Sequence, residues 1–262
     1  MISRNLEKAR QAFRHLDPAA SRKAHEDGGP PEEHQTGHGQ YLKSFVYGGL
    51  DGIVTTFAVV AGVAGANLSS GVVLILGVAN LIADGISMAF GDYLSTKAEN
   101  EYAAAERVRE TWEVKNYPEG EKKEMIELYM DKGIAETDAK IAVDALSKYE
   151  KPWVDIMMVE ELGLIESPES PLKNALVTFG SFVFFGAIPV LIYAIARFIP
   201  FLAAHTFATA CAVTAITLFA LGTLKIYFTR ENWYRAGLEM LLLGGLAAAA
   251  AYVVGIMLGG LV

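Results

Sequence analysis

The sequence has little cysteine and lacks the common catalytic motifs. Cys211 is the one cysteine among 262 residues, so a single chain can build neither a disulfide framework nor a thiolate zinc site. None of the five histidines follows a glutamate by three residues, which excludes the Glu-x-x-His pair of di-iron oxidases. The sequence also lacks a His-Glu-x-x-His motif, a phosphate-binding glycine loop and a Gly-x-Ser-x-Gly motif. We therefore expect neither an enzyme nor a protein that binds a cofactor or hydrolyses ATP.

Basic residues are outnumbered by acidic ones. The chain has 30 Asp and Glu against 22 Lys and Arg, and residues 93–169 alone hold nineteen acidic against ten basic side chains. Nucleic acid is not an expected partner, because neutralising phosphates requires clustered Lys and Arg. A local excess of carboxylates instead favours divalent metal ions.

Long apolar runs make up much of the remaining chain. Apolar residues are 52% of the sequence and its mean hydropathy is +0.30, which is unusual for a soluble protein. A helix needs about 20 apolar residues to span a bilayer. We predict an all-α, multi-pass membrane protein with five transmembrane helices, at residues 45–66, 71–92, 172–196, 201–226 and 236–261.

The segments between the spans determine the expected topology. Residues 67–70 allow only a tight turn, so the first two spans must be antiparallel neighbours. The polar N-terminus lacks the apolar core of a signal peptide, and we expect a flexible tail with a helix over 5–16. Basic residues near the span ends gather on one side, which the positive-inside rule assigns to the cytosol together with the N-terminus and the acidic block. They are Lys43, Lys97, Lys173, Lys225, Arg230 and Arg235, with Arg197 alone on the other side.

The predicted division of the chain follows from these assignments. It consists of a cytosolic tail (1–44), two spans (45–94), a cytosolic helical metal-binding domain (95–170), which we call the acidic module, and three spans (171–262). Residues 93–114 contain no Gly or Pro, so the second span should continue into the module as one long helix. Three further helices are expected in the module, over 121–132, 137–149 and 154–162. Gly133 should end the first of them, Thr137 should cap the second, and Pro152 should interrupt the chain before the third. Ser170 and Pro171 should begin the third membrane span.

Carboxylates inside apolar spans are the first candidate functional residues, because their insertion cost favours a pathway or a paired site. Asp51 lies about six residues, or roughly 9 Å, into the first span. In the second span Asn80, Asp84, Met88 and Asp92 recur every fourth residue and share a helix face, with Met88 at a depth that matches Asp51. A carboxylate beside a thioether suits Fe(II) or another late divalent metal better than Mg(II) or Ca(II).

The acidic module holds the second set of candidate ligands. Its glutamates are spaced three or four apart, so each group can line one helix face: Glu106, Glu110 and Glu113, then Glu121, Glu124 and Glu127. Met157, Met158 and Glu161 follow. Two adjacent methionines are expected to offer only one side chain to a core, so the second indicates another role. Glutamates on a solvated helix surface remain the alternative.

Three runs of sequence resemble the vacuolar iron transporter family: residues 51–62, 87–95 and 155–163. The resemblance covers residues from about Tyr41 to the C-terminus, and the tail up to Gln40 is longer than the family leads us to expect. It implies a homodimer that exports Fe(II) from the cytosol in exchange for protons, with Asp51 and Met88 at the dimer interface. The metal ligands that it implies in the acidic module are Glu110, Glu113, Glu121, Glu124, Met157, Met158 and Glu161.

Several alternatives stay open on sequence alone. Five helices can hardly enclose a pathway, and their small-residue faces favour a homodimer over packing within one subunit. A membrane-anchored metal buffer or sensor is the competing interpretation, and a passive channel is another. Mn(II), Zn(II) or Co(II) could replace Fe(II). The membrane would be the inner membrane of a bacterium or the vacuolar membrane of a eukaryote.

Overall fold

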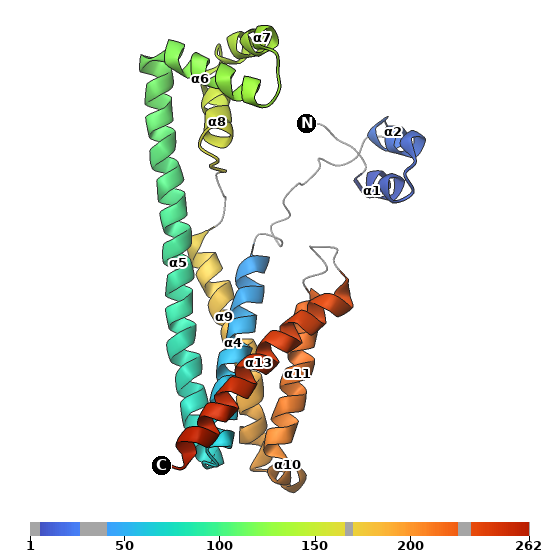
Figure 1. Cartoon of the computed structure of the whole chain (residues 1–262), viewed down its shortest axis with the longest axis vertical. Coiled ribbons are helices and arrows are strands. Elements are labelled where there is room, and N and C mark those ends of the chain that lie inside the picture. Colours follow the sequence, from blue (N-terminus) through green and yellow to red (C-terminus); the bar gives the residue numbers. More distant parts are fainter. Residues whose placement is uncertain (1–5, 27–40, 166–169, 225–231, 262) are drawn as a thin grey trace. The chain divides into compact units, whose positions relative to one another are not determined.

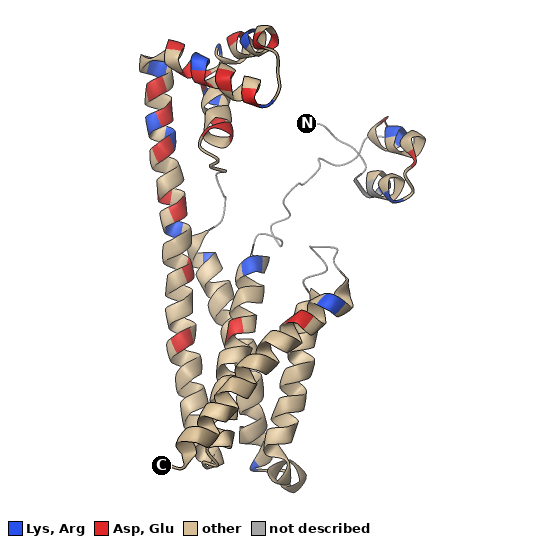
Figure 2. Cartoon of the chain, in the orientation of Figure 1, with Lys and Arg blue, Asp and Glu red and all other residues tan. Residues whose placement is uncertain are grey.

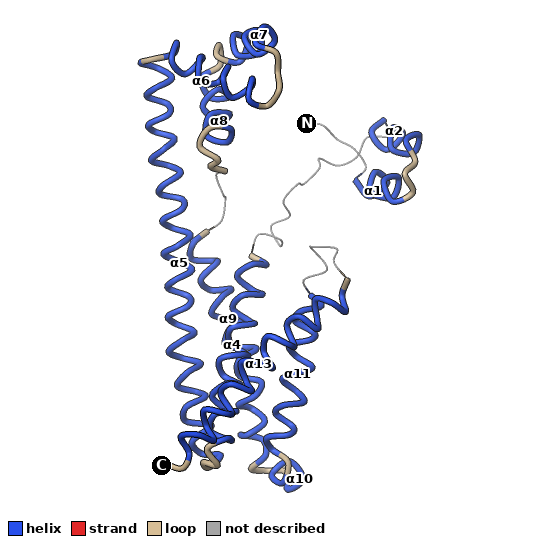
Figure 3. Tube along the Cα trace, viewed as in Figure 1, coloured by secondary structure: helices blue, strands red, loops and turns tan. Residues whose placement is uncertain are grey.

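A computed structural model describes residues 6–26, 41–165, 170–224 and 232–261 (Figure 1). Every regular element in these ranges is a helix, and they contain no strand (Figure 3). The all-α prediction is therefore confirmed. The chain divides into two compact units, Met1–Leu42 and Lys43–Val262. Lys225 and Arg230, which entered the orientation argument, lie outside the described residues.

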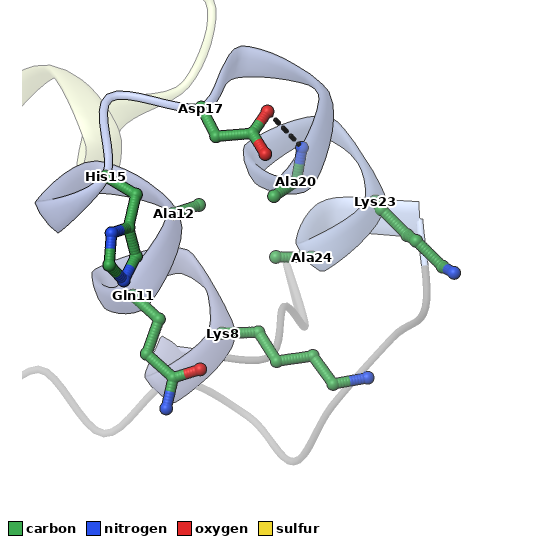
Figure 4. A pocket seen from close by; sticks show the side chains of 8 residues that line it. All are labelled: Lys8, Gln11, Ala12, His15, Asp17, Ala20, Lys23 and Ala24. Carbon is green, nitrogen blue, oxygen red and sulfur yellow. Dashed lines mark hydrogen bonds between the residues drawn. The ribbon is translucent and has the colours of Figure 1, made fainter.

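The N-terminal unit is a helical hairpin, where the sequence predicted a flexible tail with one helix. Helices α1 (Leu6–Arg14) and α2 (Pro18–Glu26) are joined by Leu16, whose φ of 50° is left-handed. Asp17 Oδ1 accepts hydrogen bonds from the backbone N–H groups of Ala19 (2.9 Å) and Ala20 (3.1 Å), and so caps α2. Asp17-Pro18 is a helix-start signal that the prediction overlooked. Figure 4 shows the open cavity between the helices, which Lys8, Gln11, His15 and Lys23 help to line.

Within the described residues, five helices are long and apolar enough to cross a membrane, as predicted. They are α4 (Leu42–Gly65), α5 (Ser70–Asn116), α9 (Pro171–Ala196), α11 (Thr206–Leu224) and α13 (Trp233–Gly259). Helix α5 has 47 residues, about 70 Å at 1.5 Å per residue, so it continues far beyond a bilayer core of about 30 Å. The predicted extension of the second span into the acidic module is confirmed.

The turn between α4 and α5 is tight, as predicted. Asn67 adopts a left-handed φ of 56°, its N–H donates to Ala64 O, and the Leu68 N–H donates to Val63 O. This is the double hydrogen bond of a Schellman motif. The turn makes α4 and α5, the two candidate spans, run in opposite directions.

Glycines allow the membrane helices to approach closely within one subunit. A Cβ at Gly52 of α4 would collide with the backbone of Phe182 on α9, and a Cβ at Gly255 of α13 would collide with the backbone of Gly62 on α4. Small residues in lipid favour association because they let dispersion contacts form between backbones. Gly62 and Gly255 therefore serve packing within the subunit, so these small-residue faces no longer support a homodimer.

The fourth span is shorter than predicted. Helix α10 (Pro200–Ala204) ends at His205, whose φ of −131° and ψ of 29° are not helical, and α11 starts at Thr206. The apolar composition of 201–226 concealed this break, because hydropathy does not report backbone conformation.

The acidic module consists of the outer part of α5 with α6 (Pro118–Asp131), α7 (Glu136–Leu146) and α8 (Glu150–Glu160). Acidic and basic side chains gather here (Figure 2). Gly133, with φ of 89°, follows the end of α6 as predicted. Two predictions were wrong: Ala135 rather than Thr137 occupies the N-cap of α7, and Pro152 lies inside the first turn of α8. Proline is tolerated there because first-turn N–H groups have no helical acceptor.

Candidate metal sites

The junction of three helices positions the carboxylates of the acidic module. Glu110 and Glu113 lie on the last turns of α5, and Glu121 lies in the first turn of α6. Only Tyr117 separates these helices, so the chain turns sharply there and the two sets of glutamates meet (Figure 1). Gly163, with φ of 65°, lets the chain turn directly after α8, where Glu161 is the C-cap residue.

The glutamates form two overlapping groups. One carboxylate oxygen each from Glu110, Glu113 and Glu121 lie within 4.8 Å of one another, and so do oxygens from Glu121, Glu124 and Glu161. Glu121 belongs to both groups. The structure thus brings together all five glutamates that the family resemblance implied as ligands. We call these five residues the glutamate cluster.

Glu110 shows that the glutamate cluster suits a cation. Its side chain is 0% exposed, and neither of its carboxylate oxygens has a hydrogen-bond partner within the described residues. Glu121 Oε2 is likewise buried without a donor. An unpaired buried carboxylate is costly, and a bound cation or a proton removes the cost. Oxygen ligands at this separation fit a divalent ion.

The raised pKa values of the glutamate cluster also indicate a site that suits a cation. Burial raises the pKa of Glu121 to about 8, and the neighbouring charge of Glu110 contributes to the rise. Burial and the charge of Glu110 also raise the pKa of Glu161. In the absence of metal Glu121 therefore retains a proton near neutral pH. Metal and protons must compete for the same oxygens.

Arg109 is the residue of this site that the sequence analysis missed. Its Nε donates to Glu106 Oε2 at 2.8 Å and its Nη1 donates to Glu113 Oε2 at 2.7 Å. Its Nη2 lies 3.9 Å from Glu110 Oε2. The spacing could have revealed it, because Arg109 is three residues after Glu106 and four before Glu113 on one helix. Glu106 is thus bound to arginine and lies outside the glutamate cluster.

The two methionines do not behave as predicted. Met157 is 0% and Met158 1% exposed, and both belong to a hydrophobic cluster with Val114, Met125 and Val143 from the other helices of the module. The premise that only one of two adjacent methionines can enter a core was wrong, because α8 has neighbouring helices on more than one side. Burial alone therefore explains both side chains, and their role as ligands stays a prediction.

The candidate intramembrane site combines α4 and α5. Asp51 is partly buried on α4, and Asp84 of α5 lies close enough for its charge to act on that of Asp51. Met88 follows Asp84 by one turn and is partly buried. The side chain of Asp84 is exposed in a single chain. An ionised carboxylate in contact with hydrocarbon is costly, so Asp84 requires a water-filled path or a second protein surface.

The end of this helix face that is nearer the acidic module is hydrogen-bonded to α9. Asp92 accepts a hydrogen bond from the Thr178 hydroxyl, and Asn174 Nδ2 donates to Thr96 Oγ1 at 3.1 Å. Asp92 thus joins α5 to α9. Asn80 Nδ2 is buried without a hydrogen-bond partner in the described part of the chain.

A further acidic residue in an apolar span escaped the sequence analysis. Glu239 lies on α13, six residues after the helix begins at Trp233, and its side chain is exposed in a single chain. Its signal was a lone carboxylate near the start of the predicted span 236–261.

Comparison with known proteins identifies the family. A family model described as the VIT family matches residues 42–256. The chain belongs to the VIT family. It is similar to proteins named "Vacuolar iron transporter" from Toxoplasma gondii (strain ATCC 50861 / VEG), with 44% identity over 97% of this chain and 89% of the relative, and from Plasmodium falciparum (isolate 3D7), with 35% identity over 98% of each. "Vacuolar iron transporter 1" of Arabidopsis thaliana is 37% identical over 84% of this chain and 87% of the relative.

These matches confirm that the chain is an integral membrane protein of a transporter family and not an enzyme. They also correct one expectation. The tail before Tyr41 was judged long for the family, yet the alignments with the Toxoplasma and Plasmodium relatives cover nearly the whole chain and so extend into it. The alignment with the Arabidopsis relative is shorter. A long N-terminal segment is thus shared by part of the family.

Proposed function

We propose that this VIT-family protein exports Fe(II) from the cytosol in exchange for protons. The observation that carries the proposal is the pair of intramembrane carboxylates, Asp51 and Asp84, whose charges interact across two adjacent apolar helices. A mere membrane anchor has no reason to accept their insertion cost. The names of the relatives indicate iron as the substrate.

Competition between metal and protons for one site is sufficient to couple metal transport to proton transport. A carboxylate in apolar surroundings binds a proton or a metal ion, but it does not bind both comfortably. If the protein alternates access between the two sides, Asp51 releases metal into an acidic compartment and returns protonated. Met88 adds a polarisable thioether that favours Fe(II) over oxygen-seeking ions. Mn(II), Zn(II) and Co(II) are candidate competing substrates.

The protein works as a homodimer in this proposal. Two observations on α5 support it: Asp84 is exposed within an apolar span, and Val108 (71% exposed) and Trp112 (62%) are exposed in the acidic module. Val108 and Trp112 lie one turn apart on a helix face that points away from the buried Glu110. A second copy that packs along α5 would cover this apolar surface and shield Asp84 from lipid.

The acidic module is proposed to bind Fe(II) before transport. Support comes from the buried carboxylate of Glu110, whose oxygens accept no hydrogen bond within the described residues, and from the grouping of oxygens around Glu121. The positive-inside rule places the module and the N-terminus in the cytosol, because Lys43, Lys97 and Lys173 lie near the same ends of the spans.

Reconstituted vesicles test this function. Protein with its acidic module outside is placed in vesicles with an acidic interior, and Fe(II) entry and internal pH are followed together. We expect entry to accelerate with the pH gradient and to be accompanied by proton efflux. Entry without proton movement would indicate a passive channel, and metal binding without entry would indicate a buffer or sensor.

A further inference from the structure

Arg109 occupies part of the proposed metal site of the acidic module. Its guanidinium group contacts three carboxylates at once, with Nε on Glu106 and Nη1 on Glu113, while Nη2 lies 3.9 Å from Glu110. Glu110 and Glu113 belong to the glutamate cluster. Arg109 is thus a cation already in place where the metal is expected.

Other cations of the module have ion-pair partners outside the cluster. Arg107, two residues earlier on α5, pairs with Asp155 at 2.7 Å. Lys132 pairs with Glu160, also on α8. The position of Arg109 is therefore specific to this residue and does not simply follow from the density of charge.

A metal ion and Arg109 compete for the same carboxylate. Glu113 Oε2, which accepts the 2.7 Å hydrogen bond from Arg109, is one of the two oxygens with which Glu113 can bind a metal. Charge-assisted bonds between arginine and carboxylates are strong, and arginine stays protonated at all physiological pH values. A divalent ion that binds Glu113 through Oε2, or through both oxygens, must therefore loosen this bond whatever the pH.

We infer that Arg109 is a resident competitor that a divalent metal displaces from Glu113, and that it thereby sets the metal concentration at which the acidic module fills. This inference rests on the proposed metal-binding role of the module. The displacement cost is the same for every divalent ion, so it lowers all affinities by the same factor. Ions that bind oxygen ligands only weakly, such as Mg(II), then bind too weakly to displace Arg109, whereas tighter-binding transition metals still occupy the site.

The test compares Arg109→Gln with a matched control. Arg107→Gln removes the same charge from the same helix, but its partner is Asp155 rather than the glutamate cluster. Mn(II) and Mg(II) binding to the full-length protein in detergent is measured by calorimetry for the wild type and both variants. For Arg109→Gln we expect the affinity for both ions to rise on the order of tenfold at unchanged stoichiometry. Arg107→Gln should change the affinity for either ion by less than about twofold.

Arg109→Lys is a second variant that keeps the test valid if Arg109→Gln does not fold. Lysine keeps the charge but cannot contact Glu106 and Glu113 with one planar group, so its affinity should lie between the wild type and Arg109→Gln. Unchanged or weaker binding by Arg109→Gln, with circular dichroism like that of the wild type, would show that Arg109 only positions the glutamates and would overturn the inference. Absence of Mn(II) binding by the wild type would instead refute the metal site itself, and the inference with it.

Discussion

The carboxylates of Glu110 and Glu121 face each other at the junction of α5 and α6, with oxygens within 4.8 Å and both side chains buried. Like charges this close in a dry environment cannot both stay ionised without a cation. A proton satisfies the pair in the metal-free protein, and a divalent ion can replace it. This competition connects metal binding to pH.

Metal affinity of the acidic module should therefore rise with pH. The pKa of Glu121 is raised to about 8, mainly by burial, so the metal-free site keeps a proton below that pH that metal must expel. We expect Mn(II) affinity to increase between pH 6 and 8, by at most about tenfold per unit for each proton released, and to level off above pH 8. Calorimetry in buffers of different ionisation enthalpy would count the protons. Equal affinity at pH 6 and pH 8 contradicts this prediction.

Removing the glutamates should lower metal stoichiometry without abolishing transport. Replacing Glu110, Glu113, Glu121 and Glu124 together with alanine leaves Asp51 and Met88 intact, so residual Fe(II) flux should survive in vesicles. Glu127→Ala is the control, because Glu127 is exposed on the same helix as Glu121 and pairs with Lys123 at 3.7 Å. If the quadruple variant binds as many ions as the wild type, these glutamates are ordinary solvated side chains.

Asp51→Asn should abolish Fe(II) flux while the acidic module still binds metal. The amide has a similar shape but can neither carry the exchanged proton nor balance the metal charge. Met88→Ala should weaken flux and reduce the preference for Fe(II) over Mg(II). Flux assays in vesicles and calorimetry on the same preparations separate transport from binding. Wild-type flux in Asp51→Asn would exclude Asp51 from the transport site.

Gly52→Ala should destabilise the membrane domain. The new Cβ would collide with the backbone of Phe182, which cannot move without shifting α9. Overpacking of this kind costs about 1–3 kcal/mol. Gly180→Ala on α9 is the control, because a Cβ there meets nothing within 4 Å. Thermal unfolding in detergent should show a lower midpoint for Gly52→Ala only, and equal midpoints would show that α4 and α9 can separate without cost.

The limits of prediction can be seen in particular residues. The absence of Gly and Pro from residues 93–114 was enough to predict the long α5, and Gly133 was enough to predict that α6 ends before it. The start of α7 at Glu136 and the position of Pro152 inside α8 were missed, because helix starts depend on local backbone geometry that several residue types can provide. Adjacent Met157 and Met158 were misjudged because burial depends on how many helices surround α8.

The sequence by itself determined that this chain is helical, has five segments apolar and long enough to cross a membrane and carries an acidic segment between the second and third of them, because apolar runs and charge density are properties of the chain. Only the tertiary structure decided that Glu121 joins two groups of carboxylates and that Asp84 lies close enough for its charge to act on Asp51. Such contacts depend on the sharp turn of the chain at Tyr117 and on how closely glycine-bearing helices approach. Hydropathy and spacing along one helix contain no information about either.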